Sequence, residues 1–390
     1  MAAPMRKTFH RKFHSLLKDK SQIWQTDRDN FSKIQNRSFQ TRSKFFPIRI
    51  SLKGGIFGTL TVAGAVTLGN LAQKSIRVYA AVNERLQLKP SREVRVPEAD
   101  YGLKLTMYQF TSCPFCCKLR SVLDYYGFSY DIIEVNSVNK KQIKWSDYKK
   151  VPILVCEDVG KNGCLQLNDS TVIISILQSY LLDRSQSLEK LASYYPALEG
   201  QDEKGKKTVE FQNKYFLMYQ QAELTDNRTK EQYEEERKWR RWTDSDLVHM
   251  LSPNVYRTPS ESLETFRHFD KVGEWEKNFS SWERTVVIYV GASVMWVMGK
   301  IIKRKYGLKD EVRDSLYDSC RLWTKTVGKR KLLGGDKPNL ADLSVYGVLT
   351  SIEGCQAFED TLNNTKIGPW FYRMKDACIN HKGSSSSHHS

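Results

Sequence analysis

The sequence has few cysteines and few histidines, and no internal repeat is present in it. Eight cysteines in 390 residues are too sparse for a disulfide scaffold. Its hydrophobic fraction of 40% and charged fraction of 27% exclude a mainly disordered chain and a polytopic membrane protein. At roughly 100–200 residues per domain, the chain is long enough for two domains and a tail.

Acidic residues are nearly missing from the first 53 residues, which hold thirteen Lys or Arg against three Asp. This extension accounts for +10 of the net charge of +17, so the rest of the chain is only mildly basic. Such an extension is typical of an import presequence or of a cytosolic arm beside a membrane. We expect no nucleic-acid binding, because the basic and aromatic run Trp239–Trp242 has the acidic run Glu234–Glu236 beside it.

A stretch without charge, Gly54–Gln73, follows the basic extension. Its 20 residues can just cross a hydrocarbon layer of about 30 Å. Gly54 and Gly58 have the small-xxx-small spacing that favours helix association in lipid. We predict a transmembrane or targeting segment here; the alternatives are a cleaved targeting segment and a glycine-rich region that only resembles one. Residues 74–100 are predicted to form an extended linker.

Strand and helix patterns alternate over residues 101–195. Alternating apolar residues predict strands at 103–110, 130–135, 151–155 and 165–167. Helical spacing predicts helices at 114–126, ending before Gly127, near 138–149, and after Asp169. This order is typical of an α/β thioredoxin-like or glutaredoxin-like unit.

Helical patterns continue through residues 196–380, where we predict an all-α domain followed by a disordered tail at 381–390. The uncharged run Thr285–Gly299 has 15 residues, which is short for a membrane span, so we predict a buried helix there. Asn339 and Asp342 have the spacing of a helix N-cap and an acidic residue at the third helical position.

The motif Cys113-Pro114-Phe115-Cys116 stands where a predicted strand ends and a helix begins. Pro114 suits the first helical position, because its missing N–H would have no partner there. Cys113 then lies just outside the first turn, beside free N–H groups and the positive end of the helix dipole, which favour thiolate over thiol. Cys116 lies one turn inside, where it can trap a mixed disulfide or donate a hydrogen bond.

Two other interpretations of this cysteine pair stay open, namely half of a zinc site and two buried structural cysteines. No second CxxC is present, and no His pair follows the motif at ligand spacing, so we predict no metal site. Cys117 is expected to point to another helical face and to serve core packing.

Two downstream features support a ligand site around the motif. Val151-Pro152 precedes a strand, and a cis bond there would aim the backbone of Val151 at a peptide-like ligand. Asp169-Ser170 opens a helix whose free N–H groups suit a carboxylate, while Asp169 suits an ammonium group. Glutathione carries both groups at its γ-glutamyl end.

The segments YQF-TS-CPFC-K, KKVPIL, LQLNDST-VIISIL, LVHMLSPNVYRT and KPNLADLSVYGVL closely resemble the membrane-associated prostaglandin E synthase 2 family, whose members are glutathione-transferase-like. The resemblance covers roughly residues 100–375. It implies a thioredoxin-like domain, a helical glutathione-transferase-like C-terminal domain, and a homodimer that isomerises prostaglandin H2 to prostaglandin E2. It also implies glutathione as a cofactor, haem bound with it, and an N-terminal anchor in Golgi membranes that is removed in a cytosolic form.

Carried over by position, the resemblance makes Cys113 the essential thiol and Cys116 its partner. It gives glutathione contacts to Phe115, to Val151 with Pro152, and to the Asp169-Ser170 pair. The family commonly has a tyrosine three residues before the first cysteine. This chain has Phe110 there, which removes a hydroxyl donor from the site.

We expect the Cys113 sulfur to engage one peroxide oxygen of the substrate, and loss of the adjacent carbon-bound proton to give the ketone. A glutaredoxin-like thiol–disulfide oxidoreductase and a non-enzymatic glutathione- and haem-binding protein are the alternatives. For location, a single-pass anchor in the Golgi membrane is expected, with the mitochondrion as the alternative.

Overall fold

The structure is a computed structural model that describes residues 88–97, 99–159, 163–201, 205, 207–219 and 228–384. All of them belong to one compact unit, Ala72–Ser390. The predicted basic extension, the predicted membrane segment Gly54–Gln73 and residues 74–87 of the predicted linker lie outside the described residues.

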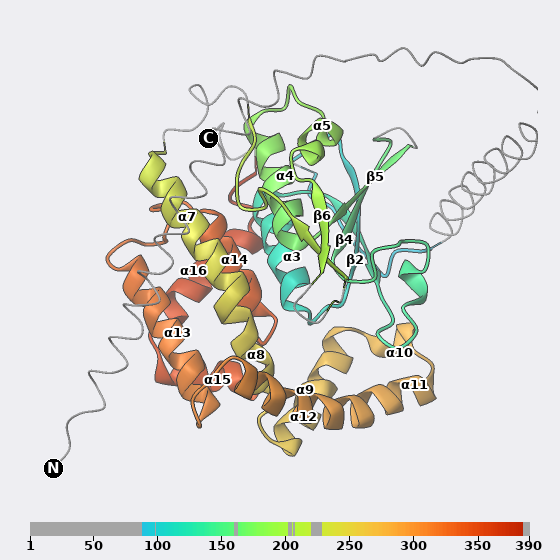
Figure 1. Cartoon of the computed structure of the whole chain (residues 1–390), viewed down its shortest axis with the longest axis vertical. Helices are drawn as coiled ribbons and strands as arrows, with labels where there is room; N and C mark the ends of the chain where they lie inside the picture. Colours follow the sequence, from blue (N-terminus) through green and yellow to red (C-terminus); the bar gives the residue numbers. More distant parts are fainter. Residues whose placement is uncertain are drawn as a thin grey trace, which may run out of the picture. The chain divides into compact units, whose positions relative to one another are not determined.

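A five-stranded sheet forms the first part of this unit (Figure 1). The strands lie in the order β1-β3-β2-β4-β5, in which β2 and β3 are parallel and the other neighbours are antiparallel. This confirms the predicted thioredoxin-like unit. In chain order, its elements are β1 (Arg92–Val94), β2 (Lys104–Gln109), α3 (Pro114–Tyr126), β3 (Tyr130–Glu134), a 3₁₀ turn (Lys141–Ile143), β4 (Ile153–Glu157), β5 (Cys164–Asn168), α4 (Ser170–Leu182) and α5 (Leu188–Ser193).

The two faces of the sheet are covered differently. Because strand side chains alternate, Met107 and Leu154 lie in one buried cluster with the apolar residues of α3 and α4. Their neighbours Tyr108 and Ile153 lie in a second cluster, which the segment around Trp145 covers. Helices α3 and α4 therefore hold one face, and the loop before β4 holds the other.

Two predictions for this part of the chain are wrong. The helix predicted near residues 138–149 is only a single 3₁₀ turn, because side chains there take up backbone groups that a helix would pair. The Asn136 carboxamide, for example, accepts from the N–H groups of Val138 and Asn139. In addition, part of the predicted linker is a strand, since β1 pairs antiparallel with β3.

The second part of the unit is mainly helical, as predicted. It also contains an antiparallel hairpin of β6 (Ala197–Gln201) and β7 (Lys207–Phe211), which corrects the expectation of helices throughout. The helices are α7 (Lys230–Trp242), α8 (Val248–Val255), α9 (Pro259–Val272), α10 (Trp275–Asn278), α11 (Ser281–Val286), α12 (Ala292–Lys305), α13 (Val312–Val327), α14 (Leu340–Thr350), α15 (Gln356–Asn364) and α16 (Gly368–Ile379), with π-helical segments at Thr243–Leu247 and Val287–Gly291.

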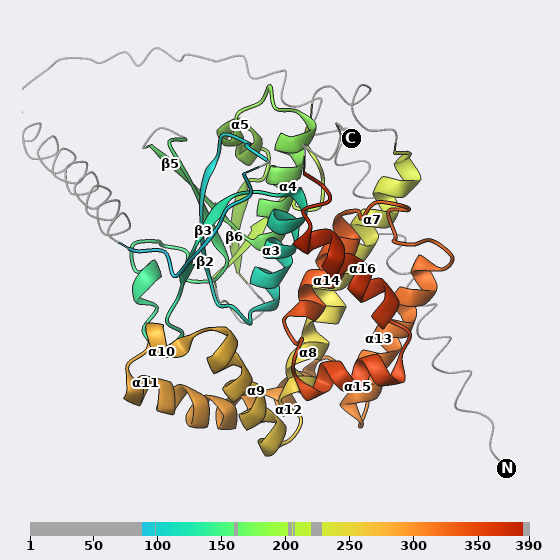
Figure 2. The same ribbon diagram turned by 180° about the vertical axis from the view of Figure 1, so that it is seen from behind.

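Helices α3 and α4 lie between the sheet and the C-terminal helices α7, α14 and α16 (Figures 1 and 2). The closest approach is between α3 and α14, where a Cβ atom added to Gly347 would lie 2.5 Å from the Cα atom of Lys118. At the same crossing the Ser121 hydroxyl donates to the carbonyl of Leu343 at 2.8 Å. Helix α14 begins as predicted, with the Asn339 side chain accepting from the backbone N–H of Asp342.

The predicted buried helix at Thr285–Gly299 is longer and more exposed than expected. Residues Ser281–Lys305 form one continuous helix of 25 residues, and only 17% of its most apolar 18-residue window is buried. By length and composition it is the one helix among the described residues that could cross a membrane.

Part of the predicted disordered tail is packed. The Gly383 N–H donates to the carbonyl of Tyr125 at 2.9 Å, and the His381 ring lies 2.6 Å from the carbonyl of Asp124. Residues 381–384 therefore close over the C-terminal end of α3, and residues 385–390 lie outside the described part.

Candidate active site

Three chain segments meet at one edge of the sheet. Strand β4 pairs antiparallel with both β2 and β5, so that Ile153 lies opposite Tyr108 on one side and Asn168 on the other. The end of β2, the start of β4 and the end of β5 therefore share one edge. The segments that follow or precede them carry Cys113, Val151 with Pro152, and Asp169 with Ser170, the residues that sequence analysis singled out.

Cys113 occupies the N-cap position of α3. Its backbone is extended (φ −74°, ψ 123°), and Pro114 follows at the first helical position, as predicted. The Cys113 N–H donates to the carbonyl of Phe110 at 3.0 Å, which closes the turn between β2 and α3. The sulfur thus stands beside the free N–H groups of the first turn, where a negative charge is favoured.

The two cysteines of the motif have opposite pKa shifts. A hydrogen bond from the Cys116 thiol lowers the pKa of Cys113 against the effect of burial, and the N–H groups of Cys116 and Phe115 and the charge of Arg120 lower it further. Burial and the neighbouring Cys113 raise the pKa of Cys116 well above its ordinary value. Cys113 therefore ionises before Cys116, and the protonated Cys116 thiol favours the thiolate at Cys113.

The third thiol lies behind the motif. Burial raises the pKa of Cys117 to about 11, and only 3% of the residue is exposed, so its expected packing role fits the structure. The guanidinium of Arg120 donates to the Cys117 sulfur at 3.0 Å and to the Thr111 carbonyl at 2.8 Å. Arg120 thereby fixes the loop that leads into Cys113.

The Val151–Pro152 peptide bond is cis, as the sequence predicts. Pro152 is buried and Val151 is partly exposed, so the backbone of Val151 stays accessible at the edge. The two phenylalanines of the site flank it. Phe115 packs against the apolar cluster between the sheet and helices α3 and α4. Phe110 packs with Val151 against the cluster on the opposite face of the sheet.

Asp169 caps α4 from a left-handed backbone conformation (φ 68°). One carboxylate oxygen accepts from the N–H groups of Thr171 at 2.9 Å and Val172 at 3.2 Å. Ser170 is 4% exposed, and its N–H at the first helical position has no partner within the helix. The start of α4 is thus a second helix N-terminus at the same edge as Cys113.

Sequence analysis missed Tyr148, a partly exposed tyrosine at this edge. Burial raises the pKa of Tyr148 to about 12, and the charges of Asp169, Cys113 and Cys116 contribute to the shift. Its ring packs in the same cluster as Phe110 and Val151. Tyr148 therefore places a protonated phenol near both cysteines, although Phe110 supplies none. Its position in a Lys-rich segment gives no signal of this.

Two buried charged groups also support the site. Glu134, at the end of β3, accepts from the N–H of Thr111 at 2.6 Å and thereby holds the loop before Cys113. Lys118, on α3, donates to Asp244 at 2.5 Å and to Thr171 on α4 at 2.7 Å. Asp244 thus ties together the two helices whose N-termini form the site.

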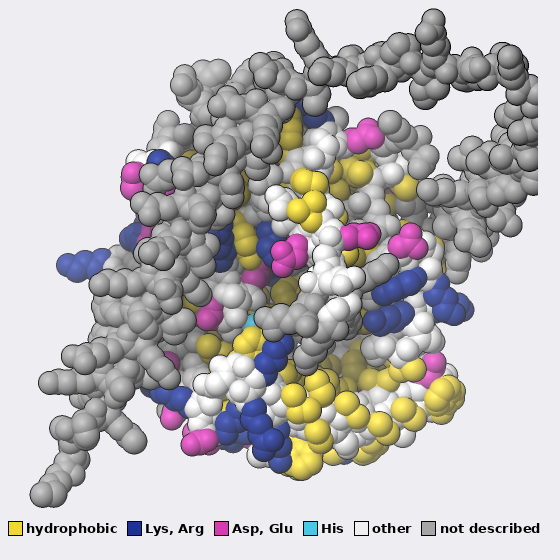
Figure 3. Space-filling model, in the orientation of Figure 1, with side chains coloured by type: hydrophobic (Ala, Val, Ile, Leu, Met, Phe, Trp, Pro, Cys, Tyr) yellow, Lys and Arg dark blue, Asp and Glu magenta, His cyan; other side chains and the backbone are white. Residues whose placement is uncertain are grey.

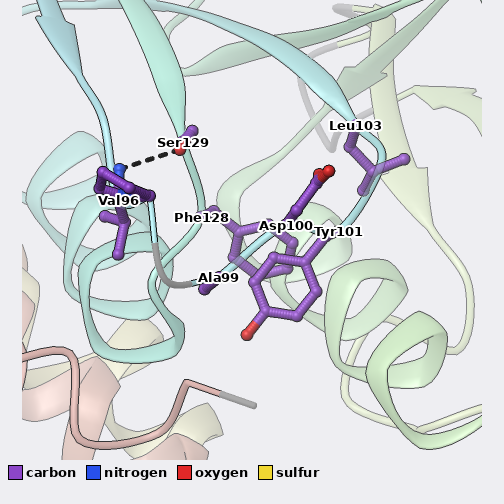
Figure 4. A pocket seen from close by; sticks show the side chains of 8 residues that line it. Val96, Ala99, Asp100, Tyr101, Leu103, Phe128 and Ser129 are labelled. Carbon is purple, nitrogen blue, oxygen red and sulfur yellow. Dashed lines mark hydrogen bonds between the residues drawn. The ribbon is translucent and has the colours of Figure 1, made fainter. Parts of the chain in front are cut away.

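A surface pocket of about 240 Å³ lies at the opposite end of β2 and α3 from Cys113 (Figure 4). Ser129 at its rim accepts from the Val96 N–H at 3.0 Å, and Tyr101 and Phe128 form its floor. None of the predicted site residues lines it. Among the described residues, no group of three or more His, Cys, Asp or Glu side chains is arranged to hold a metal ion.

The first part of the unit is similar to a known domain family. The profile of the glutathione S-transferase N-terminal domain matches residues 107–180. A glutathione transferase family member from Pseudomonas fluorescens, solved with two glutathione molecules bound, aligns over 77% of this chain and 97% of its own, with a TM-score of 0.40 and 12% identity.

Two vertebrate proteins are much more similar in sequence. Prostaglandin E synthase 2 of Danio rerio is 40% identical over 349 residues, which are 88% of this chain and 89% of that protein. Prostaglandin E synthase 2 of Mus musculus is 40% identical over 348 residues, with the same coverage of both chains. On this similarity over nearly its whole length, the chain belongs to the prostaglandin E synthase 2 family.

Proposed function

We propose that this protein is a prostaglandin E synthase, an isomerase that converts prostaglandin H2 to prostaglandin E2 with Cys113 as its nucleophile. The observation that carries the proposal is the position of Cys113, a partly exposed residue at the N-terminus of α3, where Cys116 lowers its pKa. Membership in a family named for this activity supports prostaglandin H2 as the substrate.

The reaction needs one nucleophile and no net electron donor. The Cys113 thiolate attacks the peroxide oxygen on the ring carbon that becomes the ketone. A sulfur–oxygen bond forms, the O–O bond breaks, and the second oxygen leaves as an alkoxide that takes up a proton. A base then removes the hydrogen on the first carbon, its electron pair forms the C=O bond, and the sulfur leaves as thiolate. Substrate and product are isomers, so the thiol is regenerated unchanged.

Glutathione is the proposed cofactor at the same edge. In this arrangement its γ-glutamyl carboxylate lies at the N-terminus of α4, where the Ser170 N–H is available, and its ammonium group pairs with Asp169. The backbone of Val151 before cis-Pro152 pairs with the cysteinyl unit of the tripeptide. Phe110 and Phe115 are proposed to contact its apolar parts.

The Cys113→Ser variant tests this proposal against its first alternative. We expect it to lose prostaglandin E2 formation, since a hydroxyl at this position is not ionised near neutral pH. Normal turnover by that variant would reject the role of Cys113. A dithiol exchanger needs both thiols to reduce a disulfide between two peptides, so Cys116→Ser should abolish that reaction but only slow the isomerase.

Three further features implied by the family take no part in the isomerisation. They are haem bound together with glutathione, a homodimer, and an N-terminal anchor in the Golgi membrane, with the mitochondrion as the other location. The residues at the edge fit glutathione. Phe110 supplies no hydroxyl that could hold haem at the same edge.

A further inference from the structure

The helix Ser281–Lys305 has the composition of a membrane helix, but most of it faces outward. Its most apolar 18-residue window has a mean hydropathy of 1.8 and is only 17% buried. Six of its large side chains, spaced three to four residues apart, are 42–65% exposed: Trp282, Val286, Val290, Val294, Val297 and Ile301. We call this surface the α11–α12 face. Figure 3 shows the hydrophobic side chains gathered over α11 and α12.

The opposite side of the same helix is fixed to the protein. Ala292 and Gly299 are buried, and the Ser262 hydroxyl on α9 donates to the Ala292 carbonyl at 2.7 Å. A Cβ atom on Gly299 would lie 3.6 Å from the Cα atom of Pro253 on α8. The helix therefore cannot cross a bilayer without leaving α8 and α9. It can only lie flat on a surface with the α11–α12 face downward.

Of the six charged residues in Ser281–Lys305, Glu283 and Arg284 lie at the start, and the other four, all cations, lie at the C-terminal end. Lys300, Lys303, Arg304 and Lys305 fall within six residues, and no acidic residue lies between Ala292 and Lys305. The ammonium group of Lys300 lies 4.0 Å from the centre of the Trp296 ring, at the border of the apolar surface. An apolar stripe with a basic end and aromatic residues is typical of helices that lie in the interface of an anionic membrane.

A second copy of this chain would match the face less well. Paired across a two-fold axis, each basic end would meet the same helix of the other copy, which offers Glu283 as its single carboxylate. Anionic lipid head groups supply the missing negative charge along the whole basic end, while acyl chains cover the valines.

We propose that the α11–α12 face docks the folded unit on an anionic lipid bilayer, with the helix parallel to the surface and its apolar side chains about 5–10 Å into the boundary of head groups and acyl chains. This contact is separate from any anchor in the predicted segment Gly54–Gln73.

The fluorescence of Trp282 reports whether the α11–α12 face contacts lipid, and it can be followed in the full-length chain. Vesicles of phosphatidylcholine with phosphatidylserine are prepared with and without brominated acyl chains, which quench nearby indoles. The difference between the unmodified chain and Trp282→Phe isolates the emission of Trp282. We expect bromolipid to quench this emission. Val290→Glu with Val294→Glu should weaken the quenching about tenfold or more, because two charges would enter the apolar layer.

The charged end is tested separately. Lys300→Gln with Arg304→Gln should weaken binding to phosphatidylserine vesicles by roughly fivefold for each cation removed. With pure phosphatidylcholine the same variant should behave as the unmodified chain. Val209→Glu changes a valine of similar exposure on the hairpin, and this matched control should change neither result.

Two results would overturn the proposal. One is Trp282 emission that is insensitive to bromolipid while the chain is vesicle-bound. The other concerns the double variant Val290→Glu with Val294→Glu. If light scattering shows a dimer for the unmodified chain and a monomer for this variant, while the quenching of Trp282 is undiminished, the face belongs to a second copy. Far-UV circular dichroism of each variant checks that it is folded.

Discussion

The chemistry of the site depends on the hydrogen bond between two thiols. Cys116 is fully buried and holds its proton, so it donates to the Cys113 sulfur and favours the thiolate there. Its role in an isomerase is then electrostatic. A dithiol exchanger would instead use it as a second nucleophile.

Cys116→Ala should therefore raise the pKa of Cys113, because the hydrogen bond that lowers it is lost. Since a hydrogen bond to a charged group contributes about 1.5–3 kcal/mol, alkylation of Cys113 at neutral pH should become about tenfold slower or more. The pH profile of iodoacetamide labelling measures this, and it should move to higher pH. Cys116→Ser, which keeps a donor, should shift it less; an unmoved profile in the alanine variant would refute the hydrogen bond.

Tyr148 brings a phenol hydroxyl to the edge at which Phe110 has none. With its pKa raised to about 12, its phenol stays protonated at neutral pH and can protonate the departing alkoxide. Tyr148→Phe should lower kcat by about a hundredfold and leave the pH profile of Cys113 labelling unchanged. Steady-state kinetics with prostaglandin H2 test this, with Tyr372→Phe, an exposed tyrosine on α16, as the control. Equal kcat values in both variants would exclude the role.

Among the elements, α3 and α4 are held in position by one buried ion pair. Burial alone would raise the pKa of Asp244, but the charge and hydrogen bond of Lys118 outweigh it, and the pKa lies below its ordinary value of 3.8. Lys118 is 2% exposed, so removal of its partner leaves a buried ammonium group.

Asp244→Ala should lower the free energy of unfolding by about 3–5 kcal/mol, as measured by urea denaturation. The pKa of Asp244 is lower in the folded state than in the unfolded state. The carboxylate therefore contributes its full stabilisation at pH values above its ordinary pKa, and this stabilisation is lost as the pH falls through the lowered pKa. The difference between the two proteins should therefore shrink in that acidic range. Asp336→Ala breaks an exposed pair with Lys331 and should leave stability unchanged. A similar loss in both variants would show that burial of Lys118 is not the cause.

For the whole molecule, the last described residues join the C-terminus to the helix that carries the thiol. His381 and Gly383 bond to the carbonyls of Asp124 and Tyr125, at the end of α3 remote from Cys113. The Asp124 carbonyl also accepts from the Gly127 N–H at 3.1 Å, whereas the Tyr125 carbonyl depends on the contact with Gly383.

A chain that ends at Asn380 should lose about 1–3 kcal/mol of stability, because these two hydrogen bonds are removed. Its thermal midpoint should fall by a few degrees in calorimetry, while glutathione binding stays the same. A chain that ends at Ser384 keeps both contacts and serves as the control. Equal midpoints for the two chains would show that the contacts do not contribute.

The sequence by itself determined what depends on neighbours along the chain. Pro114 and Gly127 bound α3 correctly, since one suits the first helical position and the other takes the left-handed conformation after the last turn (φ 72°). The position of Cys113 at the N-terminus of that helix follows from the same local rules, whereas the cis bond before Pro152 is expected from the thioredoxin-like fold.

Tertiary structure decided what depends on residues far apart. Lys118 meets a carboxylate 126 positions later, and Tyr148 lies at the same edge as Cys113 because β4, which follows it in the chain, pairs with β2. Hydropathy marked Thr285–Gly299 as apolar, but whether such a helix faces the core or the outside is set by which elements pack on it. Among the described residues, α8 and α9 pack on one side of it, while most of its apolar window stays exposed and open to a partner.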